Sequence, residues 1–228
     1  MTATKEPQNQ SQIDDYQQRG PATMGPWTSH IWRSDPRHLL FLLARYKFCA
    51  KMLSGAANVL EIGCGDAFGT PLVLQTVRSV HCVDFEPLVV NEARKHMQAE
   101  FVRRCSFSVH DILQGPVSPQ CDAGFSLDVI EHIASADEPR FIGNIAASLK
   151  PNATFIIGTP NVAASQHASA ASAEGHVNLK SAETLRRSML TCFQNVYIFS
   201  MNDEVVHTGY SPMAHYILGM GVGVTRQK

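Results

Sequence analysis

Apolar residues follow two alternating patterns between residues 59 and 158. Runs of four or five apolar residues predict buried strands, and longer segments with apolar positions three or four apart predict helices. The predicted strands are 59–62, 80–84, 106–110, 123–127 and 154–158. The predicted helices are 68–77, 87–98 and 138–149. This alternation indicates parallel strands with helices on both faces of the sheet.

The pattern changes after Pro160. Residues 161–180 are rich in Ala and Ser, and we expect a long loop there, which in a compact domain is usually functional or mobile. A helix is predicted at 181–190, and strands at 193–199 and 215–218 are expected to pair and close the sheet. The expected fold is a doubly wound α/β domain whose seven-stranded sheet is mostly parallel, with an antiparallel C-terminal strand.

The amino-terminal part differs from the alternating region. Residues 1–24 are polar, rich in Gln and without periodicity, which predicts a flexible leader. Residues 25–55 predict a helical lid that packs against a core at 57–160. With the loop and closing strands of 161–228, we expect residues 25–228 to form one domain.

Composition limits the partners. The 228 residues carry a formal net charge of −1, and no basic block exceeds the pairs Arg103-Arg104 and Arg186-Arg187, so we expect no nucleic-acid partner. No signal peptide and no apolar run of about 18 residues is visible, so we expect no membrane partner. Six scattered cysteines favour a reduced, cytoplasmic compartment. A small molecule is the expected partner, and a homodimer stays open.

The strongest chemical signal is a glycine-rich turn, Glu61-Ile62-Gly63-Cys64-Gly65, directly after the first predicted strand. Glycine lets the backbone approach a ligand and adopt φ angles closed to other residues. The next glycine, Gly69, follows Gly65 by four positions, whereas a dinucleotide fingerprint requires three. No Lys followed by Ser or Thr comes after this turn, so it does not match a phosphate loop. The Glu61 carboxylate suits an ammonium group, which favours a nucleoside that carries an amino acid.

Acidic residues follow the next three predicted strands. Asp84 is placed to accept hydrogen bonds from ribose hydroxyls, although it could instead cap the following helix. Asp111 could meet an adenine amino group or stabilise a turn, and Asp128 could lie against the ligand or be only a turn residue at the end of its strand. Ligands of open α/β sheets bind at the carboxyl ends of the strands. All these signals therefore converge on one edge of the sheet.

With these motifs the chain resembles the class I S-adenosylmethionine-dependent methyltransferases over residues 57–160. Asp128 with Glu131-His132 is similar to the fourth-strand motif of that family, and Lys150-Pro151-Asn152 to its turn before the fifth strand. In that turn Asn152-Ala153 replaces two glycines. The resemblance implies S-adenosylmethionine as the cofactor. The cofactor-binding residues that it implies are Glu61, Gly63, Cys64, Gly65, Asp84, Phe85, Asp111, Ile112 and Asp128.

Histidines are the candidates for a catalytic base, because imidazole titrates near neutral pH. His176 in the long loop is the first candidate, His207 the second and His132 the third. A surface histidine is the alternative for each, and His132 could instead shape the cofactor pocket. No H-x-H or H-x-x-x-H spacing supports a metal site, so we predict none.

Four more residues are expected on the acceptor side. Asn161 follows the fifth strand, and Tyr210 lies in a polar segment near the carboxyl terminus. Trp27 and His30 would form a lid over the pocket or an apolar patch at the sheet edge. The expected reaction is O-methylation of a small polar hydroxylated metabolite or a sugar or glycan precursor. The alternatives are N- or C-methylation, a non-catalytic protein with this fold and, as the weakest, a nicotinamide dehydrogenase.

Overall fold

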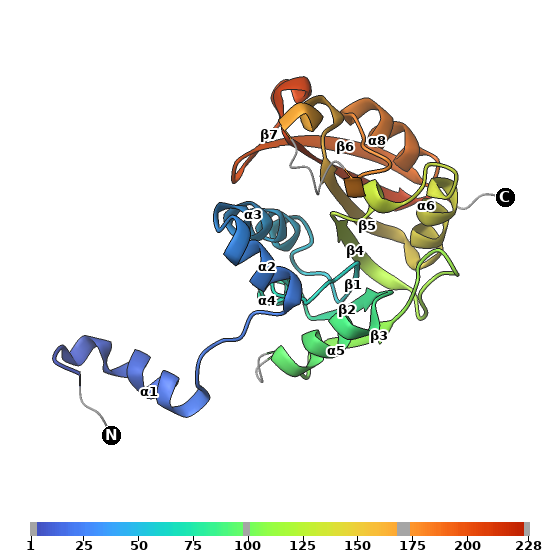
Figure 1. The fold of residues 1–228 in the computed structure, drawn as a ribbon. Coiled ribbons are helices and arrows are strands. Elements are labelled where there is room, and N and C mark those ends of the chain that lie inside the picture. Colours follow the sequence, from blue (N-terminus) through green and yellow to red (C-terminus); the bar gives the residue numbers. More distant parts are fainter. Residues whose placement is uncertain (1–3, 98–100, 168–173, 226–228) are drawn as a thin grey trace.

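One sheet of eight strands runs through the computed structural model, which describes residues 4–97, 101–167 and 174–225 (Figure 1). The strands are β1 (Asn58–Ile62), β2 (Ser79–Asp84), β3 (Cys105–Val109), β4 (Cys121–Leu127), β5 (Leu149–Pro160), β6 (Phe193–Asn202), β7 (Val205–His207) and β8 (Tyr216–Val224). Their order across the sheet is β3-β2-β1-β4-β5-β8-β6-β7. The chain therefore reverses its direction of travel across the sheet between β1 and β4, which is where ligands of such sheets bind.

The strand directions confirm a mostly parallel sheet. Neighbours among β1 to β5 are parallel, whereas β8 is antiparallel to both β5 and β6. The predicted pairing of the last two long strands is thus confirmed. The sheet has eight strands and not seven because β7, antiparallel to β6, is added at the edge. Its three residues are too few to produce a recognisable apolar run.

Helices cover both faces of the sheet. The helices are α1 (Gln10–Arg19), α2 (Pro26–Ser34), α3 (Arg37–Met52), α4 (Thr70–Leu74), α5 (Pro87–His96), α6 (Glu138–Ala147) and α8 (Ala182–Leu190). Short 3₁₀ helices are η1 (Pro7–Asn9), η2 (Ile130–His132), η3 (Val162–His167) and η4 (Ser211–Met213). Proline in the first turn of α2, α4, α5 and α6 supplies a helical φ where no amide hydrogen is needed. Among the described helices none is long and apolar enough to cross a membrane.

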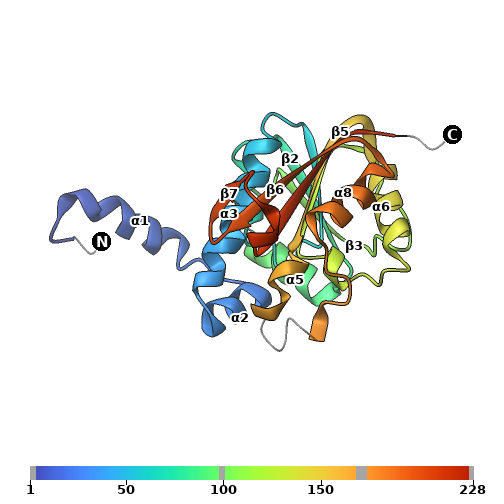
Figure 2. The ribbon, with the colours of Figure 1, turned by 90° about the horizontal axis from the view of Figure 1, so that it is seen from above.

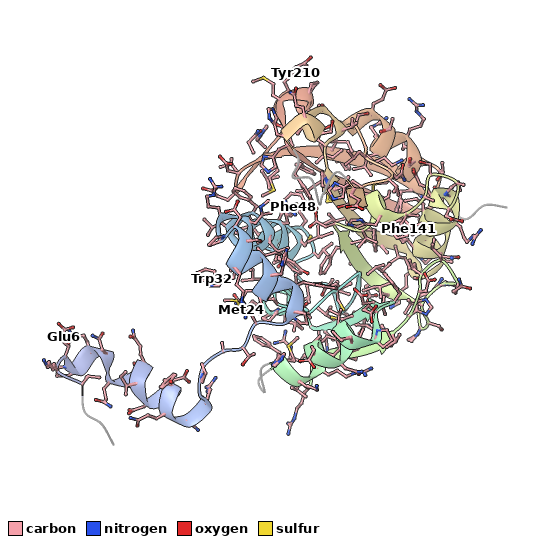
Figure 3. All side chains as sticks on the ribbon, in the orientation of Figure 1. Glu6, Met24, Trp32, Phe48, Phe141 and Tyr210 are labelled. Atoms are coloured by element: carbon pink, nitrogen blue, oxygen red, sulfur yellow. The ribbon has the colours of Figure 1, made fainter. Side chains whose placement is uncertain are left out.

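The apolar core has two halves, one on each face of the sheet. Phe141 of α6 belongs to one half and Phe48 of α3 to the other, on opposite sides of the strands (Figure 3). Figure 2 shows the same division, with α6 and α8 on one side of the sheet and α3 on the other. Successive strand residues contribute to opposite halves, as Val59 and Leu60 do, because strand side chains alternate in direction.

Two element boundaries differ from the sequence prediction. The helix expected at 68–77 is only the five residues of α4, because the turn after β1 continues to Gly69. The turn expected at Lys150-Pro151-Asn152 lies within β5, since Leu149 pairs with Cys121 and a register shift follows in β4. The prediction of a turn there is therefore wrong.

The amino-terminal leader contains regular structure. Residues 7–19 form η1 and α1, and none of the α1 side chains is buried. Figure 1 shows α1 away from the rest of the molecule, joined to α2 by an extended segment. The flexibility of this leader and the limits of the single domain stay predictions. The loop expected at 161–180 includes η3, while 168–173 lie outside the described residues.

Candidate functional site

A cavity of about 870 Å³ lies at the carboxyl ends of β1 to β4, where the sequence motifs converge. The helices α2 and α3 contribute the rest of its wall. The predicted site residues that line it are Trp27, Gly63, Cys64, Gly65, Asp84, Phe85, Asp111, Ile112, Asp128 and His132. A second cavity, of about 720 Å³, is lined mainly by α6 and by none of the predicted site residues.

The glycine-rich turn requires its glycines. Gly63 and Gly65 have φ of +73° and +52°, in the left-handed region that favours glycine. A Cβ atom on Gly63 would lie 2.2 Å from Cγ2 of Val129, and one on Gly65 2.9 Å from Cδ1 of Trp27. The turn is therefore packed between the segment after β4 and the amino-terminal helix α2.

Asp84 holds this turn in place. Its Oδ2 accepts a hydrogen bond from the Gly65 amide at 3.0 Å, and its Oδ1 accepts one from the Glu86 amide at 3.0 Å. Each carboxylate oxygen can accept a further hydrogen bond. Asp84 is therefore both a support for the turn and a potential acceptor for a ligand in the cavity.

Glu61 does not line the cavity. Its side chain is buried and accepts hydrogen bonds from the Tyr46 hydroxyl and the Thr70 hydroxyl, both at 2.7 Å. Burial raises the pKa of this carboxyl to about 7. Glu61 therefore ties α3 and α4 to β1, and the structure gives no support to the expected contact with an ammonium group.

Asp111 and Ile112, which follow β3, also line the cavity. Oδ1 of Asp111 accepts a hydrogen bond from the Leu113 amide at 2.9 Å, which stabilises the turn after β3. Ile112 is 5% exposed and joins the core. Phe85, next to Asp84, is 71% exposed, so its ring is free to contact a ligand.

The amino-terminal helix α2 is fastened to the glycine-rich turn. Both the amide and the hydroxyl of Thr28 donate to the Asp66 carboxylate, each at 2.8 Å. Trp27 thereby lies in the cavity wall, while His30 is exposed and outside it. No local sequence signal relates Thr28 to Asp66, because they are 38 positions apart.

A buried ion pair forms part of the cavity wall. Nη1 of Arg45 lies 2.6 Å from Oδ2 of Asp128, and the guanidinium stacks on the Tyr216 ring at 3.8 Å from its centroid. Asp128 has φ of +57°, so the wall is built on a left-handed residue. Sequence reasoning missed Arg45, which lies within an apolar helix.

Glu131 of η2 lies directly behind this pair. Its Oε2 accepts a hydrogen bond from the Thr159 hydroxyl at 3.0 Å, and its buried Oε1 has no partner. Burial, and next the charge of Asp128, raises the pKa of this carboxyl to about 8. A protonated or cation-bound carboxyl is therefore favoured at this position.

The structure brings two of the three predicted catalytic histidines together. The rings of His132 and His176 are 5.2 Å apart between centroids. The amides of Val177 and Asn178 both donate to the Glu131 carbonyl, at 2.8 and 3.0 Å, which holds the His176 segment against η2. Burial, and next the neighbouring His132, lowers the pKa of His176.

The other predicted residues lie outside the cavity. Both ring nitrogens of His207 are hydrogen-bonded, Nε2 to Asn202 Oδ1 and Nδ1 to the Gly209 amide. The side-chain amide of Asn161 donates to the carbonyls of Ser211 and Ala214, so it fastens β5 to η4. Tyr210 is 72% exposed at the periphery (Figure 3).

Sequence similarity to known proteins falls on the segment that supplies most of the cavity lining. Residues 59–152 match a family model described as a methyltransferase domain. A probable S-adenosylmethionine-dependent methyltransferase from Mycolicibacterium smegmatis is 27% identical over 104 residues, which are 46% of this chain and 38% of that protein. Over this segment the chain is similar to S-adenosylmethionine-dependent methyltransferases. The match spans under two fifths of that curated relative.

Two further proteins resemble this chain. The mitochondrial ubiquinone biosynthesis O-methyltransferase of Schizosaccharomyces pombe is 27% identical over 105 residues, which are 45% of this chain and 37% of that protein. The structure of the N-methyltransferase NodS from Bradyrhizobium japonicum, in complex with S-adenosyl-L-homocysteine, covers 94% of this chain and 97% of its own. Its TM-score is 0.62 at 20% identity, which establishes a shared fold.

Proposed function

We propose that this chain binds S-adenosylmethionine in the 870 Å³ cavity and transfers its methyl group to a hydroxyl of a small polar acceptor. The observation that carries the cofactor assignment is the meeting of the glycine-rich turn, Asp84 and Asp111 in one cavity at the carboxyl ends of the strands.

The chemistry of the cavity wall fits this cofactor. Gly63 and Gly65 leave space that a Cβ atom would fill. The carboxylates of Asp84, Asp111 and Asp128 accept hydrogen bonds and attract positive charge. They suit ribose hydroxyls, an adenine amino group and a sulfonium, and they disfavour the phosphates of a dinucleotide.

When bound, S-adenosylmethionine supplies a methyl group on a positively charged sulfur. The contribution of this chain is to orient the reactants and exclude water. We assign the exclusion of water to α2, because Thr28 fastens it to the glycine-rich turn and Trp27 lies in the wall. Proton removal from the acceptor hydroxyl is assigned to the pair His132 and His176, of which His132 lines the cavity.

A polar acceptor is supported by buried polar atoms without partners. Among the described residues they include Nε of Arg45, Oε1 of Glu131 and the Tyr216 hydroxyl. Such an atom costs about 1–3 kcal/mol unless a ligand or ordered water satisfies it. Electrostatic coupling of Arg45 and Tyr216 to Asp128 places them near the cavity wall. Polar groups of an acceptor held next to Asp128 would supply partners for Arg45 and Tyr216.

An amine acceptor is the second candidate. The carboxyl groups of Asp128 and Glu131 lie near one another and would attract an ammonium group. The named relatives include both an O- and an N-methyltransferase. A small-molecule partner, the absence of a nucleic-acid partner, a homodimer and a cytoplasmic location stay predictions.

The test is calorimetric titration of the full chain with S-adenosylmethionine and S-adenosyl-L-homocysteine, followed by methyl transfer to panels of hydroxylated and amino compounds. We expect micromolar binding and turnover on a polyhydroxylated compound. Turnover on amines alone would replace O-methylation by N-methylation. No binding of either nucleoside would leave a non-catalytic protein with this fold as the better interpretation.

A further inference from the structure

Three side chains of metal-binding type meet beside the cavity. Glu131 and His132 come from η2, and His176 comes from the segment after the described gap. Each offers one ligand atom, and these atoms all lie within 4.8 Å of one another. We infer that Glu131, His132 and His176 bind a divalent transition-metal ion, with Zn²⁺ as the best match.

The carboxyl group of Glu131 is the first argument. Its side chain is completely buried, and Thr159 satisfies only Oε2. The unpartnered Oε1 is a buried acceptor without a donor. Leaving it unsatisfied destabilises the fold, and a cation would satisfy it.

The orientation of His132 is the second argument. Its Nδ1 lies 2.9 Å from the carbonyl oxygen of Gly175, which can only accept a hydrogen bond. Nδ1 therefore carries the proton, and Nε2 keeps its lone pair. A ligating histidine commonly donates its other N–H to a carbonyl in this way, because the bond fixes the ring and its tautomer.

The anchoring of His176 is the third argument. Two backbone hydrogen bonds from Val177 and Asn178 to the Glu131 carbonyl hold its segment. The Asn178 side chain adds bonds with the Ser135 hydroxyl at 3.0 Å and with Glu138 at 2.8 Å. These hydrogen bonds therefore hold His176 beside the side chains of Glu131 and His132.

The geometry requires only a small adjustment. Ligand atoms around a tetrahedral ion at 2.0–2.1 Å are roughly 3.4 Å apart, so the three atoms must draw together by at most about 1.4 Å. His132 is exposed and His176 half-buried, which leaves their rings room to move. Two histidines and one glutamate with a free fourth position are the ligand set of several catalytic zinc sites.

The role of such an ion depends on the proposed function. Because His132 lines the cavity, the ion would be beside the acceptor. A hydroxyl in the fourth position would lose its proton to water more easily, as metal-bound water does. Its oxygen would then form the bond to the methyl carbon while the methyl–sulfur bond breaks, with the electron pair going to sulfur. With the ion bound, this step replaces the role of bases that the proposed function gives to His132 and His176, which then act as ligands.

Metal binding is tested without the acceptor. Untagged full chain is freed of metal with a chelator, then titrated with Zn²⁺ by calorimetry and with Co²⁺ by visible absorption. We expect one equivalent of each ion and a d–d absorption band for Co²⁺. His132→Gln and His176→Gln are each expected to weaken Zn²⁺ binding by about tenfold or more. The matched control is His96→Gln on α5, where His96 pairs with Glu92 at 3.1 Å far along the chain from the cluster.

Two results would overturn the site: no saturable binding to the wild type, or binding that neither substitution in the cluster weakens. Far-UV circular dichroism of the same variants checks that they fold, and we expect spectra that match the wild type. S-adenosyl-L-homocysteine titration of the wild type tests the proposed function separately. Zn²⁺ binding without nucleoside binding would contradict the proposed function and keep the metal site. Nucleoside binding without Zn²⁺ binding would do the opposite.

Discussion

Asp84 supports the proposed cofactor contact with two hydrogen bonds of its own. Its oxygens accept from Gly65 and Glu86, which aligns the turn before any ligand arrives. Alignment of the turn and direct binding would both be lost together in an alanine variant. Substitution of this single residue is therefore the sharpest test of the cofactor assignment.

Asp84→Ala is expected to weaken S-adenosyl-L-homocysteine binding by about 1–3 kcal/mol, because ligand hydroxyls lose an acceptor. Calorimetric titration of wild type and variant measures the difference. Asp35→Ala is the control, since Asp35 pairs with Arg37 on the surface outside the cavity. Equal affinities for the Asp84 variant and the wild type would refute the ribose contact.

Glu61 makes stability depend on pH. Its folded pKa of about 7 lies above the ordinary 4.5, so the folded state holds a proton that the unfolded state releases. The stabilisation is complete below pH 4.5 and is lost as pH rises through about 7. Between pH 5 and 8 the wild type should lose about 2–3 kcal/mol more than Glu61→Gln. Urea unfolding at the two pH values tests this, and equal losses would contradict it.

Among the helices and strands, α2 is the one whose position is easiest to change by a single substitution. It joins the body through Thr28 and Asp66, and Thr28 is the buried residue of this helix. Its position over the glycine-rich turn thus depends on a charge-assisted pair of hydrogen bonds. Loss of one of these hydrogen bonds should therefore loosen α2 and leave the sheet unchanged.

Thr28→Val keeps the size of the side chain and removes its hydroxyl bond to the Asp66 carboxylate. Because such a bond contributes about 1.5–3 kcal/mol, amide hydrogen exchange in α2 should become about tenfold faster or more. Mass spectrometry measures this, with α6 as the internal reference. Ser34→Ala, which removes a surface hydroxyl bond to the His30 carbonyl in the same helix, should leave the rates nearly unchanged. Equal exchange in both variants would show that α2 is held by other contacts.

Most strands and helices follow from local periodicity, and the exceptions have tertiary causes. β5 extends back to Leu149 because Cys121 of β4 pairs with that residue. β7 exists because β6 offers a free edge to three residues. Neither the partner strand nor the free edge is visible in a window of neighbouring residues.

The Arg45 and Asp128 ion pair acts at the scale of the whole molecule. It joins α3 to the end of β4, and the stack on Tyr216 adds β8. Three elements far apart in sequence therefore meet at the buried guanidinium of Arg45. Removal of one partner should cost more than removal of both.

Arg45→Met is expected to lower the free energy of unfolding by about 3 kcal/mol, because it leaves Asp128 without its cation. This is the lower end for buried pairs, since the Asp128 side chain is 31% exposed. Arg45→Met combined with Asp128→Asn should recover part of the loss, as urea denaturation would measure. A double variant as unstable as the sum of the two single variants would contradict coupling between these residues.

The sequence by itself determined the sheet class, the edge at which the cavity lies and many of the residues that line it. These depend on features that neighbouring residues encode: apolar periodicity, a glycine turn and acids at strand ends. The general rule that parallel strands end at one edge then brings those acids together. It is for this reason that Asp84, Asp111 and Asp128 line one cavity as expected.

Only the tertiary structure decided how the remaining side chains meet. His132 and His176 are 44 positions apart, so no spacing rule identifies the metal-type cluster. The Glu61 side chain is buried and does not line the cavity. The side chains of Asn161 and His207 are hydrogen-bonded to other parts of the fold. Such contacts are made by loops and helices whose approach depends on the packing of the whole chain, and no short stretch of sequence contains that information.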